Sequence, residues 1–212
     1  MRILDERVDA YLRDLRPGRS EVMAEMEAVA ERDSVPIVHW ETGRFLATLC
    51  RALDPVVLEV GTAIGYSTLH MAEALDEGRV VTLERDPDRA AQARASFERA
   101  GVADRVELVE GDALDTIPTL EGPFGLLFVD AAKGEYERYL ELAEPLLTER
   151  CTLVVDNLLM SGEVALPAGA DTRWNPDSLA AARALNTELL SSERWLACVL
   201  AVGDGIAFGA LR

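Results

Sequence analysis

The stretch that decides the fold is Val56-Val-Leu-Glu-Val60 followed by Gly61-Thr-Ala-Ile-Gly-Tyr-Ser67. Its first five residues are mostly β-branched or apolar, which is typical of a short strand. A helical pattern begins at Tyr66, and the two glycines before it allow the backbone to turn and to approach a ligand closely. The stretch therefore predicts a strand–loop–helix unit with a binding site where the strand ends.

The alternation of strand and helix continues along the chain after this unit. Near-continuous apolar strands separated by helices indicate a parallel sheet that is covered on both faces. Gly203-Asp204-Gly205 is a hairpin signal between the last two apolar runs, so these two strands are expected to be antiparallel. The expected strands are Val56–Val60, Val80–Glu84, Val106–Glu110, Phe124–Asp130, Thr152–Asp156, Trp195–Val202 and Ile206–Leu211. The expected helices among them are Tyr66–Leu75, Pro87–Ala100, Tyr136–Leu146 and Ser178–Leu190.

The composition is that of one ordinary globular domain. The chain has 212 residues, of which 49% are hydrophobic and 28% charged, so it is long enough to bury a large core. Helical periodicity at 3–15, 20–32 and 41–53 precedes the first strand, and no Pro/Gly-rich linker divides the chain. We interpret 1–212 as a single domain in which 1–53 forms an N-terminal helical cap and 54–212 forms the α/β core.

Charge and apolar patterning exclude several classes of protein. Apolar stretches such as Leu196–Val202 fall short of the ~20 residues that span a bilayer, and the N-terminus has no apolar signal segment. Three scattered cysteines argue against a disulfide framework or a zinc site, so we expect a cytoplasmic protein without a membrane partner. The net charge of −17 disfavours a surface that binds nucleic acid over its whole extent, although it does not exclude a local basic patch.

Acidic residues lie in or after the first three strands, at the edge where a ligand is expected. Glu59 stands where a dinucleotide fingerprint has its first glycine, so a pyrophosphate is disfavoured and a ligand with a positive centre is favoured. Glu84 follows Gly61 by about twenty residues, a spacing typical of an acid that binds ribose hydroxyls, or else it is a solvated acid before a helix. Asp112 either contributes to adenine binding or caps the next helical turn.

Oxygen-bearing residues end the fourth and fifth expected strands. Asp130, Asp156 and Asn157 are expected to meet at one edge of the sheet, where three oxygen ligands suit Mg²⁺, with Mn²⁺ or Ca²⁺ as alternatives; the alternative role of such residues is to cap helices. Lys133 is the one lysine among 21 basic residues. Because lysine can lose its proton and arginine cannot, this single lysine indicates a chemical requirement rather than drift. His39 and His70 are expected to be structural.

The ordered set of motifs over 35–210 resembles the metal-dependent class I O-methyltransferases of the catechol and caffeoyl-CoA type. The resemblance implies S-adenosylmethionine (SAM) as the methyl donor, together with a Rossmann-like, doubly wound, mainly parallel seven-stranded sheet. It also implies a divalent metal, a hydroxylated acceptor and a homodimer. The motifs that carry it are Glu59–Ser67, Glu84, Gly111-Asp112-Ala113, Asp130-Ala131-Ala132-Lys133, Asp156-Asn157 and Val202-Gly203-Asp204-Gly205.

The resemblance also implies a role for each matching residue. Gly61 and Ser67 would contact the methionine end of SAM, with the backbone of Val38 closing over it. Glu84 would bind the ribose, and Asp112 and Ala113 would flank the adenine. Asp130, Asp156 and Asn157 correspond to the metal ligands, Asp130 and Glu59 would also serve the cofactor, and Lys133 corresponds to the base.

Within this family the chain is most similar to the bacterial tRNA 5-hydroxyuridine methyltransferases, which share Val35-Pro36-Ile37 and Asp130-Ala-Ala-Lys-Gly134. Ala132 departs from the catechol enzymes, which carry a large aromatic residue there. The resemblance favours 5-hydroxyuridine in tRNA as acceptor, although the segment 166–178 contains Arg173 as its one basic residue. The alternatives are a small catechol-type acceptor, a non-catalytic SAM or nucleotide sensor, and an NAD oxidoreductase.

Overall fold

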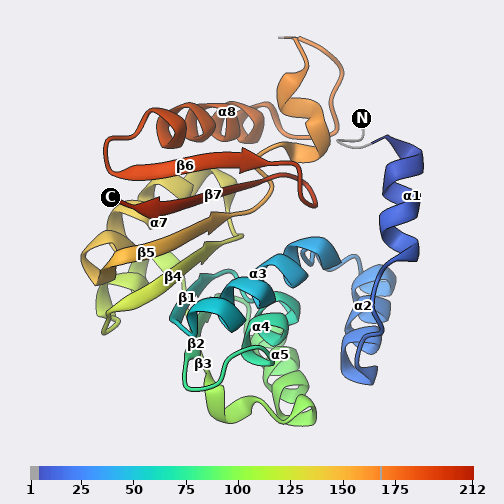
Figure 1. Ribbon diagram of the computed structural model, residues 1–212, viewed down its shortest axis with the longest axis vertical. Coiled ribbons are helices and arrows are strands. Elements are labelled where there is room, and N and C mark those ends of the chain that lie inside the picture. Colours follow the sequence, from blue (N-terminus) through green and yellow to red (C-terminus); the bar gives the residue numbers. More distant parts are fainter. Residues whose placement is uncertain (1–4, 168) are drawn as a thin grey trace.

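The computed structural model describes residues 5–167 and 169–212, and in this part of the chain a seven-stranded sheet lies between two layers of helices (Figure 1). The strand order is β3-β2-β1-β4-β5-β7-β6. The first five strands are parallel, whereas β7 is antiparallel to both β5 and β6. The expected doubly wound sheet with an antiparallel C-terminal edge is thereby confirmed. The strands are β1 (Val56–Val60), β2 (Arg79–Glu84), β3 (Val106–Glu110), β4 (Phe124–Val129), β5 (Leu147–Val155), β6 (Trp195–Leu200) and β7 (Ile206–Leu211).

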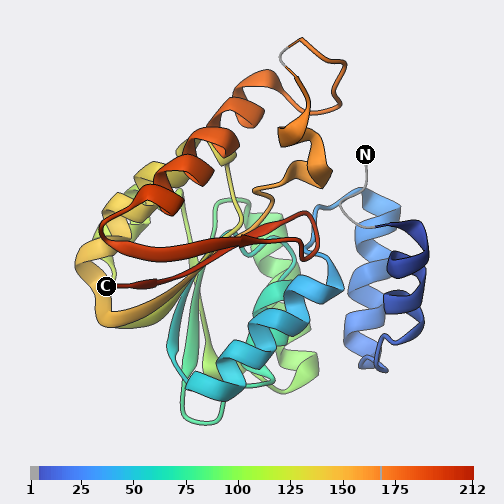
Figure 2. The same ribbon diagram turned by 45° about the horizontal axis from the view of Figure 1, so that its top comes forward.

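Two helical layers cover the two faces of the sheet. Helices α2 to α5 pack on one face and α7 and α8 on the other, as the turned view of Figure 2 also shows. The α-helices are α1 (Glu6–Asp14), α2 (Glu21–Asp33), α3 (Trp40–Leu53), α4 (Tyr66–Ala72), α5 (Pro87–Ala100), α6 (Ala113–Thr116), α7 (Tyr136–Ala143) and α8 (Pro176–Ser191). Short 3₁₀ segments are η1 (Ala103–Arg105), η2 (Ile117–Thr119), η3 (Lys133–Glu135), η4 (Glu144–Leu146) and η5 (Met160–Ala165).

The apolar character of the strands follows from this double covering. Successive side chains of a strand point to opposite faces. Val57 of β1 belongs to the core under α3 and α4, while its neighbour Leu58 belongs to the core under α7 and α8, and both are fully buried. In β5, Val154 and Val155 are divided between the two cores in the same way. Both alternating sets must therefore be apolar.

Several element boundaries differ from those expected from the sequence by one to three residues, and the largest difference is at the start of β5. β5 begins at Leu147 instead of Thr152, because it extends through Glu149 and Arg150, whose side chains are exposed and carry no apolar signal. α4 ends at Ala72 instead of Leu75. The Asp54 carboxylate accepts hydrogen bonds from the backbone N–H groups of residues 76–78, which fixes the turn into β2.

The helices before β1 differ in how closely they pack on the sheet. α3 buries Leu46 and Cys50 completely, and α2 contributes Met23 and Met26 to the same core. α1 has no buried residue and lies with α2 at the side of the molecule opposite the C-terminus (Figures 1 and 2). No helix of the described residues is long and apolar enough to cross a membrane.

Candidate active site

The carboxyl ends of the central strands bring the predicted site residues together. Past the end of β4, the Asp130 amide donates to the Val60 carbonyl at 2.9 Å, and past β5 the Asp156 amide donates to the Val129 carbonyl at 3.0 Å. These bonds extend the parallel ladder by one residue, so Asp130 and Asp156 lie side by side at one edge. Gly61 permits this approach, since a Cβ there would lie 2.1 Å from the Asp130 carbonyl oxygen.

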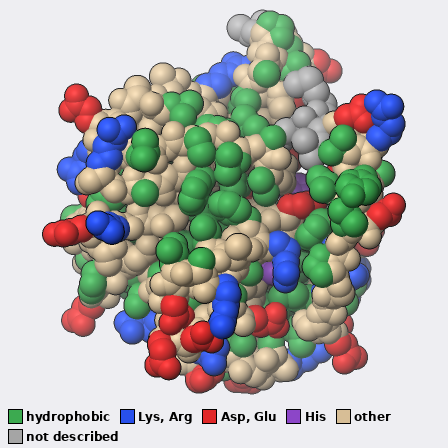
Figure 3. All heavy atoms as spheres, viewed as in Figure 1, with side chains coloured by type: hydrophobic (Ala, Val, Ile, Leu, Met, Phe, Trp, Pro, Cys, Tyr) green, Lys and Arg blue, Asp and Glu red, His purple; other side chains and the backbone are tan. Residues whose placement is uncertain are grey.

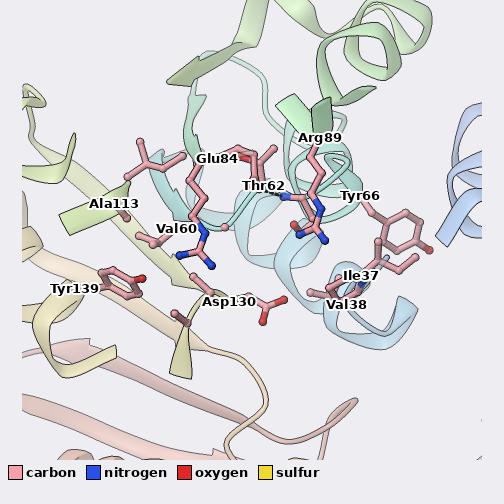
Figure 4. A pocket seen from close by; sticks show the side chains of 18 of the residues that line it. Ile37, Val38, Val60, Thr62, Tyr66, Glu84, Arg89, Ala113, Asp130 and Tyr139 are labelled. Carbon is pink, nitrogen blue, oxygen red and sulfur yellow. Dashed lines mark hydrogen bonds between the residues drawn. The ribbon is translucent and has the colours of Figure 1, made fainter. Parts of the chain in front are cut away.

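A cavity of about 270 Å³ opens at this edge (Figure 4). It lies where the chain crosses from β1 to either neighbour, the position at which doubly wound sheets bind ligands. Glu59, Lys133, Asp156 and Asn157 are not among its walls. Seven of the predicted cofactor residues line it: Val38, Gly61, Ser67, Glu84, Asp112, Ala113 and Asp130.

Glu59 lies beneath the cavity and not on its surface. It is completely buried, and its carboxylate accepts hydrogen bonds from the hydroxyls of Ser67, Thr68 and Thr82. Burial raises the pKa of Glu59 to about 7, although the three hydroxyl donors act in the opposite direction. Glu59 therefore connects β1 to the start of α4 and to β2, and Ser67 is the hydroxyl donor of this network that also lines the cavity.

Glu84 and Asp112 each bind the local backbone while facing the cavity. Glu84 accepts the Ala63 amide at 2.7 Å and the Asp86 amide at 2.9 Å, which ties the end of β2 to the glycine loop. Asp112 caps α6 by accepting the Leu114 amide at 3.0 Å. For Asp112 the capping role proposed from the sequence is thus present, and it leaves the residue in the cavity wall.

Two carboxyl groups, those of Asp130 and Asp156, lie close together at the edge of the sheet beside the cavity. Asp156 is completely buried; one carboxylate oxygen accepts the Asn157 amide at 2.7 Å, and the other, Oδ2, has no hydrogen-bond partner among the described residues. Burial and the neighbouring Asp130 raise the pKa of Asp156 to about 8. Burial likewise raises the pKa of Asp130, although Lys133 opposes the shift. Two crowded carboxyls with an orphaned oxygen suit a bound cation.

The composition of this edge is consistent with a hard cation. No group of three or more His, Cys, Asp and Glu in the described ranges is arranged to hold a metal. A site here therefore needs the amide oxygen of Asn157 beside the two carboxylates. Oxygen donors without sulfur or imidazole are the set that Mg²⁺, Mn²⁺ and Ca²⁺ prefer.

Lys133 extends from η3 to this edge. Its Nζ donates to Asn157 Oδ1 at 2.7 Å and lies 5.5 Å from the centre of the Trp174 ring. Trp174 comes from the segment between η5 and α8 and packs against the core. An aromatic wall therefore stands near Lys133 even though Ala132 supplies none.

Several residues at the site carried no recognisable signal in the sequence. Arg85, Arg89 and Tyr139 line the cavity, and Figure 4 shows the Arg89 side chain descending from α5 toward Val38. Their positions follow from the placement of α5 and α7, for which local periodicity contains no information. Asp204 of the hairpin motif lies near the acidic edge and raises the pKa of both Asp130 and Asp156.

The two histidines have different environments. His39 is exposed, with its Nε2 3.5 Å from an Asp204 carboxylate oxygen, and this contact raises the pKa of His39. His70 is buried under α3, and burial lowers its pKa to about 4, so it is neutral at pH 7. Neither ring lines the cavity at the end of β1.

Comparison with known proteins gives consistent matches over nearly the whole chain. A family model described as O-methyltransferase matches residues 15–211. A catechol O-methyltransferase of Mycobacterium tuberculosis is 42% identical over 183 residues, covering 84% of this chain and 81% of that protein. A catechol O-methyltransferase of Niastella koreensis is 38% identical over 169 residues, covering 75% and 76%. The crystal structure of the O-methyltransferase from Bacillus cereus in complex with SAH superimposes with a TM-score of 0.83 at 30% identity, covering 97% of each chain.

Proposed function

The chain belongs to the O-methyltransferase family and is a SAM-dependent enzyme; from this premise we propose that it methylates one of two neighbouring oxygens on a planar acceptor, with the help of a divalent cation. The proposal rests on the position of Asp130, which belongs both to the cavity and to the acidic edge. This residue lines the cavity and also neighbours Asp156 at the acidic edge. Donor and acceptor sites would therefore share a wall. Membership in this family argues against the sensor and NAD oxidoreductase alternatives.

The predicted cofactor residues that line the cavity support its assignment to SAM. We propose that Gly61, Ser67 and the backbone of Val38 bind the methionine end, as the motif match implies, since all three residues line the cavity and Gly61 has no side chain. Glu84 would accept the ribose hydroxyls, and Asp112 with Ala113 would flank the adenine. Glu59 would act indirectly, by orienting Ser67. SAM supplies an activated methyl group.

A divalent cation fits the acidic edge. Asp130, Asp156 and Asn157 would hold it, and the orphaned Oδ2 of Asp156 supports this assignment. A cation bound there lowers the pKa of an acceptor hydroxyl. Lys133 would receive the hydroxyl proton at Nζ, while Trp174 restricts the position of a flat acceptor by contact with its ring.

For the acceptor, we favour a small catechol-type molecule over 5-hydroxyuridine in tRNA. Both offer two adjacent oxygens, so the same residues would serve either. A groove beside His39 and Asp204 is lined by acidic residues of α1 and α3 that outnumber the basic ones. The negative charge along this groove would repel the phosphates of an RNA that lay in it. The relatives described above, which are named catechol O-methyltransferases, point the same way.

The decisive experiment measures transfer of radiolabelled methyl from SAM to a panel of catechols and, in parallel, to hypomodified tRNA that carries 5-hydroxyuridine. We expect catechol methylation that is lost in excess EDTA and recovered with Mg²⁺. RNA methylation that falls steeply with salt, without catechol methylation, would instead establish the tRNA acceptor. Full activity in EDTA would disprove the role of a cation.

A homodimer remains part of the proposal. The apolar residues Val8, Tyr11 and Leu15 of α1 and its C-cap are exposed by 46%, 63% and 58%, and Figure 3 shows hydrophobic side chains gathered on this helix. Burial of this face against a second copy would stabilise a dimer. Light scattering should give twice the chain mass, and Tyr11→Glu should give the monomer.

A further inference from the structure

A second groove, distinct from the cofactor cavity, lies between α3, α4 and the loop that joins α1 to α2. Its volume is about 560 Å³. The loop contributes Arg16 and Arg19, and α3 contributes Trp40, Arg44 and Arg51. Figure 3 shows basic side chains on the face of the molecule that is viewed there. None of the residues assigned to SAM, the cation or the acceptor lines this groove.

The positive charge of the groove is only partly neutralised. Arg16 and Arg19 share a single carboxylate, that of Glu27, and Arg51 pairs with Asp76 at 2.6 Å. Arg44 has no carboxylate partner among residues 5–167 and 169–212. Among the described residues, Glu73 is the acidic residue that lines the groove itself, so four guanidinium groups are matched by three carboxylates, those of Glu27, Glu73 and Asp76. This is a local concentration of positive charge in a chain whose net charge is −17.

A buried histidine contributes to one wall of the groove. His70 is 7% exposed, and its Nε2 has no hydrogen-bond partner among the described residues. Gly43 lets the ring pack beneath α3, because a Cβ there would lie 2.3 Å from His70 Cδ2. Burial is the largest cause that lowers the pKa of His70, and the positive charges of Arg44 and Arg16 are the next two causes. The positive potential of the arginines therefore reaches the groove wall.

We propose that this groove is a second ligand site and that it binds the phosphate group of a small molecule. Arg44 has no carboxylate partner in the part of the chain that the structure describes, and its planar guanidinium matches two phosphate oxygens at once. Arg16 and Arg19 add charge from the opposite wall, and Arg16 lies 5.6 Å from the centre of the Trp40 ring. A groove of this volume holds a ligand of small-molecule size.

The site adjoins the cofactor cavity through one side chain. Tyr66 lines both the groove and the cavity. Its hydroxyl donates to Glu27 at 2.6 Å and accepts from Arg16 at 3.3 Å. A phosphate that draws Arg16 away from Glu27 would therefore act on a wall residue of the SAM cavity, so occupancy of the two sites is expected to be coupled.

The test uses the full-length protein and inorganic phosphate as the probe. The indole N–H of Trp40 is buried, and Trp40 lines the groove. Its NMR signal, assigned with Trp40→Phe, should move saturably during a phosphate titration, while the Trp195 signal stays in place. Arg44→Gln should raise the Kd for phosphate about tenfold or more, in keeping with loss of a charged hydrogen bond. Arg138→Gln, at an exposed position of α7 away from the groove, is the matched control and should leave the Kd unchanged.

Three results would overturn the proposal. The first is an equal shift with chloride at the same ionic strength, which would mean screening only. The second is an Arg44→Gln variant that binds phosphate as well as the parent protein. The third is a response to tRNA but not to phosphate, which would assign the groove to RNA. SAH binding by Arg44→Gln, measured by calorimetry, verifies folding, because Arg44 does not line the cofactor cavity. The test does not depend on the identity of the methyl acceptor.

Discussion

At the scale of single residues, the proposed role of Lys133 as the base can be tested with one substitution. Its Nζ donates to Asn157 at 2.7 Å, and it is the one lysine in the chain. Lys133→Arg keeps a cationic donor but cannot accept a proton at neutral pH. We expect kcat to fall ~10²-fold or more, as is typical when a general base is lost. Rates with the best acceptor of the panel measure this loss.

The control for Lys133→Arg is cofactor binding. Lys133 does not line the cavity, so calorimetry should give an unchanged Kd for SAH. A variant that turns over at the parent rate across the pH range would show that Lys133 is not the base.

A second prediction at this scale concerns Gly65. Its φ is +91°, and a Cβ there would lie 2.5 Å from the Phe97 ring. Gly65→Ala should lower the free energy of unfolding by about 2–4 kcal/mol, because backbone strain adds to overpacking. Gly134→Ala is the matched control, since nothing lies within 4 Å of its Cβ position. Urea unfolding measures both variants, and equal stabilities would contradict the prediction.

At the scale of elements, the segment from η5 to α8 positions Trp174 by way of a buried acid. Glu163 is 5% exposed and accepts the Thr172 hydroxyl, while Arg173 Nε lies 3.1 Å from its other oxygen. The Trp174 amide in turn donates to the Thr172 hydroxyl at 3.1 Å. This connection explains how an irregular segment holds an aromatic ring near Lys133.

We therefore expect Glu163→Ala to raise the acceptor KM roughly three- to tenfold with a smaller effect on kcat. The reason is that the Trp174 ring loses its fixed position, whereas the reacting groups keep theirs. Trp174 fluorescence should change at the same time. Glu163→Gln still accepts the Thr172 hydroxyl and should recover part of the loss. Glu193→Ala, at an exposed position, should match the parent. An unchanged KM in Glu163→Ala would exclude this positioning role.

At the scale of the whole molecule, buried acids link stability to pH. The pKa values of Glu59 and Asp156 are raised to about 7 and about 8 from ordinary values near 4. In the folded state these groups keep protons that the unfolded chain releases above pH 4–5. The free energy of unfolding should therefore fall as pH rises from about 5 to 8.

Mg²⁺ should reverse part of this loss, because it binds the deprotonated carboxylates. At a concentration 100 times its Kd, a ligand adds about 2.7 kcal/mol, or roughly 5–10 °C in Tm for a chain of this size. Thermal scans should show this shift at pH 8 and a smaller one at pH 5.5. Asp156→Asn should abolish the Mg²⁺ shift, whereas Glu59→Gln should retain it and flatten the pH dependence. A parent-like Mg²⁺ shift in Asp156→Asn would refute the cation site.

The sequence by itself determined the sheet and the positions at its carboxyl edge. Strand alternation, the glycine loop and the hairpin signal depend on nearest neighbours along the chain, so local patterns sufficed to predict the confirmed fold. The placement of Asp130, Asp156 and Asn157 followed as well, because parallel strands necessarily end at the same edge.

Only the tertiary structure decided what surrounds those positions. The sequence did not reveal that Glu59 would be covered by hydroxyls of α4 and β2, or that Trp174 would lie near Lys133 in place of an aromatic residue at 132. Nor did it show that Arg44 and His70 would line one groove with Arg16. These contacts join segments far apart in the chain. They depend on how helices and loops pack over the sheet, and packing of that kind leaves no periodic signal in the sequence.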